Sequence, residues 1–167
     1  MNEPLEFQIG PLLRAANLKL VLAESCTGGL VGHRITNIPG SSDYYLGSIT
    51  AYAYEAKERL LGVNHVTLAK YGAVSPETAL EMARGARQAL GSHFALDQII
   101  GLSVTGIAGP GGGTETKPVG LVWFGLSAPA GEWTWSRVWP GDRVQNKEDS
   151  AEEVLKIILA YLQGEIK

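Results

Sequence analysis

Two patterns of apolar residues alternate along this chain. Short runs that are almost continuously apolar predict buried strands at 19–24 and 97–106. A stretch rich in aromatic and β-branched residues predicts another strand within 43–54. Two further runs, 119–128 and 132–140, flank the turn-forming residues Pro-Ala-Gly and are typical of a hairpin. The pattern therefore predicts five strands.

Between these runs, apolar residues recur about every third or fourth position, which predicts amphipathic helices. The expected helices cover 4–18, 27–37, 55–62, 75–91 and 149–164. The fourth has a helix-start signature, because Ser75 can cap free backbone N–H groups and Pro76 suits the first helical position. Alternation of helices and strands indicates an α/β fold with a largely parallel sheet.

The order of the elements also predicts the order of the strands. Right-handed crossovers place the first two strands side by side, and the continuous apolar runs place the first and third strands at the centre. We expect a three-layer α/β/α sandwich with a five-stranded mixed sheet of order 2-1-3-4-5, in which strand 4 is antiparallel. No repeat or linker divides residues 1–167, so a single domain is expected.

Composition narrows the classes of function. The 167 residues carry a net charge of −3 without any cluster of lysine and arginine, which argues against binding to nucleic acid or to an anionic membrane surface. The single cysteine and the absence of Cys and His residues at metal-ligand spacing predict no internal disulfide and no metal site. No secretion signal or membrane-length apolar run is apparent, so a cytoplasmic location is expected.

Three polar segments follow the first three predicted strands: "ESCTGG" (24–29), "AYAYEAK" (51–57) and "TGIAGPGGG" (105–113). If the first strand lies between the second and third, the connections diverge at its carboxyl end. Open α/β sheets bind their ligands at such a switch point. We therefore expect these three segments to converge on one site.

Ser25 is the candidate nucleophile of this site, although the residues of this segment alone favour Ser25 or Thr27 as a simple helix cap. Gly28 and Gly29 leave room for a ligand to approach a helix N-terminus, where an oxyanion or phosphate is stabilised. Cys26 is the rival nucleophile, but no histidine is placed to activate it. A buried, inert cysteine is the expectation.

Lys57 is the candidate base. It begins a short helix, where its positive charge is disfavoured, and partial burial would lower its pKa further. A neutral lysine beside a serine is one recognised way to activate a hydroxyl, and Tyr52 could join the same relay. The alternative is a solvated Lys57 and a core aromatic Tyr52.

Other segments offer contacts for an anion. The glycine-rich loop 106–118 has neither a Walker nor a dinucleotide fingerprint, so it is either a plain flexible loop or one that folds over a phosphorylated ligand. Ser41 and Ser42 offer hydroxyls for a phosphate. Arg143 is a possible anion contact or the partner of Asp142 in a salt bridge at a helix start.

Six segments occur in the order and spacing of one family: "AESCTGG", "PGSS", "Y-x-x-E-A-K", "YGAVS", "TGIAGPGGG" and "KPVG-x-V-W". From about residue 6 to 163 the chain resembles the CinA C-terminal domain family. The resemblance implies an α/β/α sandwich and nicotinamide-nucleotide amidohydrolase activity, also called NMN deamidase activity. Longer members carry an additional N-terminal domain that resembles molybdopterin-binding proteins, so the stand-alone form is expected here.

The resemblance also implies a reaction. Nicotinamide mononucleotide would be hydrolysed to nicotinic acid mononucleotide and ammonia, without a metal or an organic cofactor. Ser25 would be the nucleophile, Lys57 its base, and Tyr52 and Arg143 further site residues. From topology we add backbone N–H groups of residues 26–29 as oxyanion donors. The residues expected to hold the ribose phosphate are Thr105, Gly106, Gly109, Ser41 and Ser42.

One departure from the family leaves alternatives open. Ala53 and Tyr54 stand where members commonly have a small polar residue and an asparagine. A binding or regulatory module, linked by the family name to competence and DNA damage, is the alternative to the enzyme, and an amidase for another small amide is a third reading. A homodimer is also expected. Most of the hairpin tryptophans are expected in the core, but their alternating spacing could leave some on an exposed face that forms the contact; they are Trp123, Trp133, Trp135 and Trp139.

Overall fold

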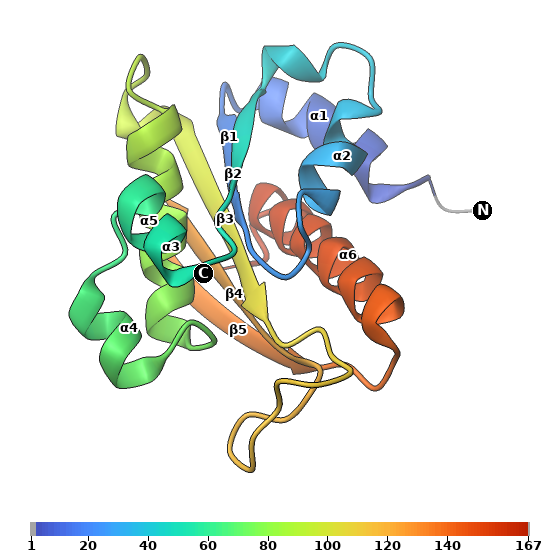
Figure 1. Cartoon of the computed structure of the whole chain (residues 1–167). Helices are drawn as coiled ribbons and strands as arrows, with labels where there is room; N and C mark the ends of the chain where they lie inside the picture. Colours follow the sequence, from blue (N-terminus) through green and yellow to red (C-terminus); the bar gives the residue numbers. More distant parts are fainter. Residues whose placement is uncertain (1–2, 167) are drawn as a thin grey trace.

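A computed structural model describes residues 3–166, which form one five-stranded sheet with helices on both faces (Figure 1). The strands are β1 (Lys19–Glu24), β2 (Tyr45–Thr50), β3 (Ile99–Gly106), β4 (Leu121–Ala128) and β5 (Gly131–Val138). The α-helices are α1 (Leu5–Ala15), α2 (Leu30–Thr36), α3 (Tyr54–Leu61), α4 (His65–Tyr71), α5 (Pro76–Leu90) and α6 (Arg143–Leu162). Within these residues, no helix is long and apolar enough to cross a membrane.

The sheet has the predicted order, β2-β1-β3-β4-β5. Strand β1 is parallel to both β2 and β3, whereas β4 is antiparallel to β3 and to β5, which confirms the expected mixed sheet. Glu24, the last residue of β1, pairs with Thr50 of β2 and Val104 of β3. The carboxyl ends of the three parallel strands therefore meet at one edge of the sheet.

Each face of the sheet has its own hydrophobic cluster. Helices α1, α2 and α6 cover one face, and α3, α4 and α5 cover the other (Figure 1). The second layer packs very closely, because a Cβ atom at Gly85 of α5 would lie 1.8 Å from the backbone oxygen of Leu61. Only glycine permits this approach of α5 to α3.

Three differences between the observed and the predicted helices affect the interpretation. Helix α4 was not predicted, although Asn64 caps it by accepting a hydrogen bond from the N–H of Val66. Helix α2 begins only at Leu30, because Gly28 and Gly29 have positive φ angles of 65° and 100°. Helix α6 begins at Arg143 rather than at 149, after its cap Asp142. Ser75 caps α5 as predicted.

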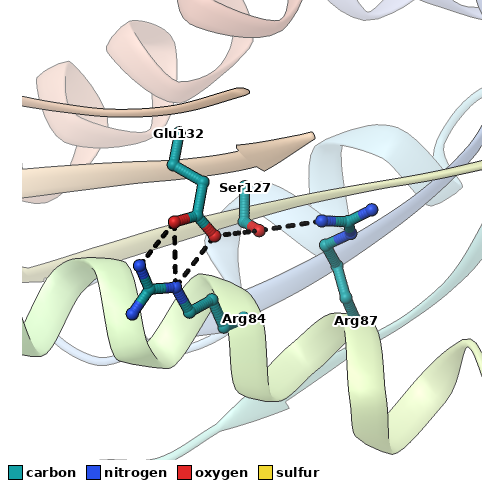
Figure 2. A network of polar contacts seen from close by, with 4 residues as sticks. All are labelled: Arg84, Arg87, Ser127 and Glu132. Carbon is teal, nitrogen blue, oxygen red and sulfur yellow. Dashed lines mark hydrogen bonds and ion pairs between the residues drawn. The ribbon is translucent and has the colours of Figure 1, made fainter. Parts of the chain in front are cut away.

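A polar network joins α5 to the β4–β5 hairpin (Figure 2). Glu132 accepts hydrogen bonds from Arg84 and from the hydroxyl of Ser127, and Arg87 donates to that same hydroxyl at 2.9 Å. Arg84 and Glu132 lie partly in solvent, so their ion pair adds little stability. The network lies at the end of β4 remote from Ser25, so it fixes the hairpin rather than the candidate site.

The four tryptophans of the hairpin region are half-buried. Trp133, Trp135 and Trp139 pack against the cluster beneath α6, and the indole N–H of Trp139 donates to Ser150 of that helix. Three of the rings therefore lie against the α6 layer with part of their surface still exposed. The homodimer itself stays a prediction, for which light scattering is the test.

Candidate functional site

Ser25 and Lys57 lie in direct contact at the carboxyl edge of the parallel strands. Ser25 continues β1 by one further hydrogen bond, from its N–H to the carbonyl of Val104. Lys57 belongs to the first turns of α3, and its side chain reaches back toward the helix start, as helical side chains do. The distance from Lys57 Nζ to Ser25 Oγ is 2.9 Å.

The environment of Lys57 favours a neutral amine. Lys57 is only 1% exposed. Besides the contact with Ser25, its amine donates hydrogen bonds to the carbonyl oxygens of Ala51 at 2.7 Å and Tyr52 at 3.1 Å. No carboxylate pairs with Lys57 within residues 3–166. Burial lowers the pKa of this amine from its ordinary value to about 8.

The three contacts also orient the neutral amine. Once deprotonated, Lys57 has two N–H groups and one lone pair. Carbonyl oxygens can only accept, so the two N–H groups point to Ala51 and Tyr52, and the lone pair is left for the hydroxyl proton of Ser25. The geometry thus suits proton transfer from Ser25 to Lys57.

Glu24 holds the turn that carries Ser25. This carboxylate is fully buried and accepts hydrogen bonds from one hydroxyl of the turn and from three backbone N–H groups at the start of α2. A fifth donor is the hydroxyl of Ser48 on β2. The other donors are the hydroxyl of Thr27 and the N–H groups of Gly29, Val31 and Gly32. A buried charge with so many donors is stabilised and rigid.

This arrangement changes the expected oxyanion donors. The N–H of Gly28 is bonded to the carbonyl of Ser25, and the N–H of Gly29 to Glu24. In the part of the chain that the structure describes, the N–H groups of Cys26 and Thr27 are the two in this turn without a hydrogen bond to another residue. The hydroxyl of Thr27 donates to Glu24, so a substrate contact of Thr27 through its backbone N–H stays a prediction.

Cys26 is buried, as expected. Burial raises the pKa of its thiol to about 12, and the nearby positive charges of Lys57 and Lys147 only partly oppose this rise. A thiol that stays protonated at neutral pH is a poor nucleophile. Ser25 is therefore the better candidate.

Tyr52 contributes to the site in a different way from the one predicted. Its carbonyl accepts from Lys57, but its side chain is 62% exposed and its hydroxyl accepts from Arg143 at 3.1 Å. The second branch of the Arg143 guanidinium donates to the carbonyl of Gly109 at 2.7 Å. The phenol therefore lies outside the Ser25–Lys57 contact, and Arg143 joins Tyr52 to the glycine-rich loop.

The loop after β3 is tied down rather than free. Asn146 of α6 donates to the carbonyl of Ala108, beside the Arg143 contact with Gly109. Thr105 is buried, and its hydroxyl donates to the carbonyl of Ala73, so the expectation that this hydroxyl holds a phosphate is wrong. At Gly106 a Cβ atom would lie 2.6 Å from Val122, so close strand packing already explains that glycine.

Ser41 and Ser42 lie at the opposite edge of the sheet. They form a single helical turn immediately before β2, whereas the Ser25 site follows the carboxyl ends of the strands. Their neighbour Asp43 accepts from Lys19, the first residue of β1. The two serines are separated from Ser25 by the full length of β1, so the prediction that they contact the same ligand within one chain is wrong.

Comparison with known proteins decides the family. Residues 2–162 match the family model of the CinA C-terminal domain. The chain belongs to this family. A CinA-like protein from Chloroherpeton thalassium is 48% identical over 165 residues, which cover 96% of this chain and 38% of that protein. This CinA domain thus spans well under half the length of the curated relatives that it matches.

Solved structures of the CinA superfamily share the fold. A competence-damaged protein (CinA) superfamily protein from Klebsiella pneumoniae is 28% identical with a TM-score of 0.88, over 96% of each chain. The competence/damage inducible protein CihA from Agrobacterium tumefaciens is 34% identical with a TM-score of 0.82, over 98% of this chain and 99% of its own.

Two cavities of this CinA domain bear on the site. One of about 490 Å³ lies beside Arg143, between the glycine-rich loop and the start of α6. A larger groove of about 890 Å³ runs between α1, α2 and α6 and contains none of the candidate residues. Ser25 itself is only 7% exposed. The smaller cavity is lined by Arg143 but not by Ser25 or Lys57.

Sequence reasoning missed two charged residues of this CinA domain. Glu24 was treated only as the polar end of a strand. A carboxylate at the end of an otherwise apolar run was the signal that could have identified it. Lys147 lies one helical turn after Arg143, and its Nζ is 3.9 Å from the position of a Cβ on Gly28. Lys147 was missed because the helix was expected to begin at residue 149, two residues after it.

No group of three or more His, Cys, Asp or Glu side chains within residues 3–166 is arranged to hold a metal ion.

Proposed function

We propose that this domain hydrolyses the carboxamide of nicotinamide mononucleotide, giving nicotinic acid mononucleotide and ammonia. The observation that carries the proposal is the 2.9 Å contact between Ser25 Oγ and a buried, carboxylate-free Lys57. A serine with a neutral amine as its only proton acceptor is equipped for acyl transfer. The choice of substrate rests on membership of the family.

In the proposed first step, Lys57 takes the hydroxyl proton as Ser25 Oγ attacks the amide carbon. The N–H groups of Cys26 and Thr27 stabilise the oxygen that becomes negative. Lys57 then returns the proton to the leaving nitrogen, the C–N bond breaks, and ammonia departs from a Ser25 ester. Water, deprotonated by Lys57, hydrolyses this ester and restores the Ser25 hydroxyl.

The pKa of Lys57 sets the expected pH dependence. With a pKa of about 8, roughly a tenth of the molecules hold Lys57 neutral at pH 7. The value of kcat/KM should therefore rise through pH 8 and level off above it, with the slope of a single deprotonation.

The test is ammonia release from nicotinamide mononucleotide by the purified chain. Ser25→Ala and Lys57→Ala should each lower kcat at least about 1000-fold, because each removes one half of the proton transfer. Matched controls are Ser42→Ala at the opposite edge of the sheet and Lys156→Ala on the exposed face of α6, both expected to retain activity. Full activity in Ser25→Ala would end the proposal.

A second candidate is a module that binds the nucleotide without turning it over. It is favoured by the burial of Ser25 and by Tyr54, which stands in place of the family's asparagine. The hydroxyl of Tyr54 accepts from the N–H of Ala73, so this side chain tethers α3 to the segment before α5. Saturable binding of nicotinamide mononucleotide with no ammonia release from wild type would support this module.

A further inference from the structure

Two cations at the start of α6 have no ionic partner among the described residues, and one of them, Lys147, lies beside the Ser25 turn. Arg143 and Lys147 are four residues apart, so they share one face of the first two turns of α6. Neither makes an ion pair within residues 3–166. Two like charges at this spacing repel each other, which makes the pair unfavourable unless an anion joins them.

The position of Lys147 is fixed by two independent observations. Its Nζ is 3.9 Å from the place of a Cβ on Gly28, so a side chain there would meet the ammonium group. Its charge is also close enough to the Cys26 thiol to oppose the burial that raises the pKa of that thiol. The ammonium group therefore lies over the turn formed by residues 25–29.

Lys147 forms no ion pair with a carboxylate of residues 3–166. Asp142 accepts from the N–H of Gln145 as the cap of α6, and Asp149 accepts from the side chain of the same glutamine. Arg143 is held by two neutral acceptors, Tyr52 and Gly109. Hydrogen bonds to an ionised acceptor are about twice as strong as these.

We propose that Lys147, together with Arg143, binds the phosphomonoester of the substrate, and that Lys147 makes the site prefer a phosphorylated ligand to its dephosphorylated form. The inference rests on the proposed function for the identity of the ligand. It replaces Ser41, Ser42 and Thr105 as the residues expected to hold the phosphate. A half-buried lysine suits this role, because its charge is only partly screened by water.

The experiment measures binding in a Ser25→Ala background, where turnover cannot interfere. Calorimetry compares nicotinamide mononucleotide, nicotinamide riboside and ribose 5-phosphate. Lys147→Ala should raise the Kd of both phosphorylated ligands about 10- to 100-fold, as expected for a hydrogen bond to a charged group, and that of the riboside less than about threefold. Lys147→Arg should restore the phosphate preference. Lys156→Ala, on the same helix, should change nothing.

Each result has one meaning. Equal weakening of nucleotide and riboside, or no change in either, would overturn the role of Lys147, as would failure of all three ligands to bind. Ammonia release by the wild-type protein is measured alongside the binding experiments. Lys147-dependent phosphate preference without ammonia release would keep this inference and remove the proposed function. Ammonia release without that preference would do the reverse. Urea unfolding of each variant establishes that it is folded.

Discussion

Replacing Lys57 by methionine should make the stability of the protein less dependent on pH. Methionine keeps the length of the buried stem but carries no charge. In the wild type the ordinary lysine pKa of 10.5 falls to about 8 on folding. At pH 7 the buried ammonium therefore lowers the free energy of unfolding by roughly 3 kcal/mol relative to a neutral amine.

The sign of the effect follows from proton counts. Between pH 8 and 10.5 the unfolded chain keeps a proton on Lys57 that the folded chain has lost. The free energy of unfolding of wild type therefore rises with pH across this window, and this contribution is lost as pH falls through 8. Lys57→Met has no such contribution. Relative to the variant, wild type should gain about 2 kcal/mol between pH 7 and 9.5.

The assay is urea unfolding of wild type and Lys57→Met at several pH values in that range. Taking the difference at each pH cancels the titration of every other group. Lys156→Met is the control, because Lys156 is exposed and its variant should run parallel to wild type. If the curves of wild type and Lys57→Met also ran parallel, Lys57 would have an ordinary pKa and the reasoning about a neutral base would fail.

Substitutions at three further positions test the surroundings of the Ser25–Lys57 pair and of the hairpin. Glu24→Ala should cost about 3 kcal/mol or more in urea unfolding, because it leaves buried N–H groups unsatisfied, whereas Glu24→Gln keeps one acceptor and should cost less. Tyr52→Phe removes only the hydroxyl that meets Arg143, so ammonia release should change less than about tenfold; a 1000-fold loss would restore the tyrosine to the proton relay. Glu132→Gln should cost only about 1 kcal/mol in the unfolding assay, because the ion pair with Arg84 is partly in solvent.

The sequence predicted the sheet because strand order follows from local rules. Continuous apolar runs mark strands covered on both faces, and right-handed crossovers fix their neighbours. The same reasoning brought Ser25 and Lys57 to one edge of the sheet, where the structure has them 2.9 Å apart. What periodicity could not give was the exact start of a helix, which depends on caps such as Asp142.

The wrong assignments have two physical causes. Residue type suggested phosphate contacts at Ser41, Ser42 and Thr105, but hydroxyls also satisfy backbone carbonyls, as that of Thr105 does for Ala73. Whether a hydroxyl faces a ligand or a neighbouring loop is decided by tertiary packing. In contrast, the topology alone already separated 41–42 from the site, because residues before a parallel strand lie at its amino end.

Alternation along β1 explains how a glutamate and a lysine can flank one serine without pairing. Successive residues of a strand point to opposite faces of the sheet, and Ser25 continues the β1 ladder after Glu24. The Glu24 carboxylate is therefore directed to the face of α2, where it accepts hydrogen bonds from five donors. Ser25 faces α3, where Lys57 meets only neutral oxygens. A carboxylate on the α3 face would pair with Lys57 and raise its pKa, so the adjacency of Glu24 and Ser25 keeps the base available.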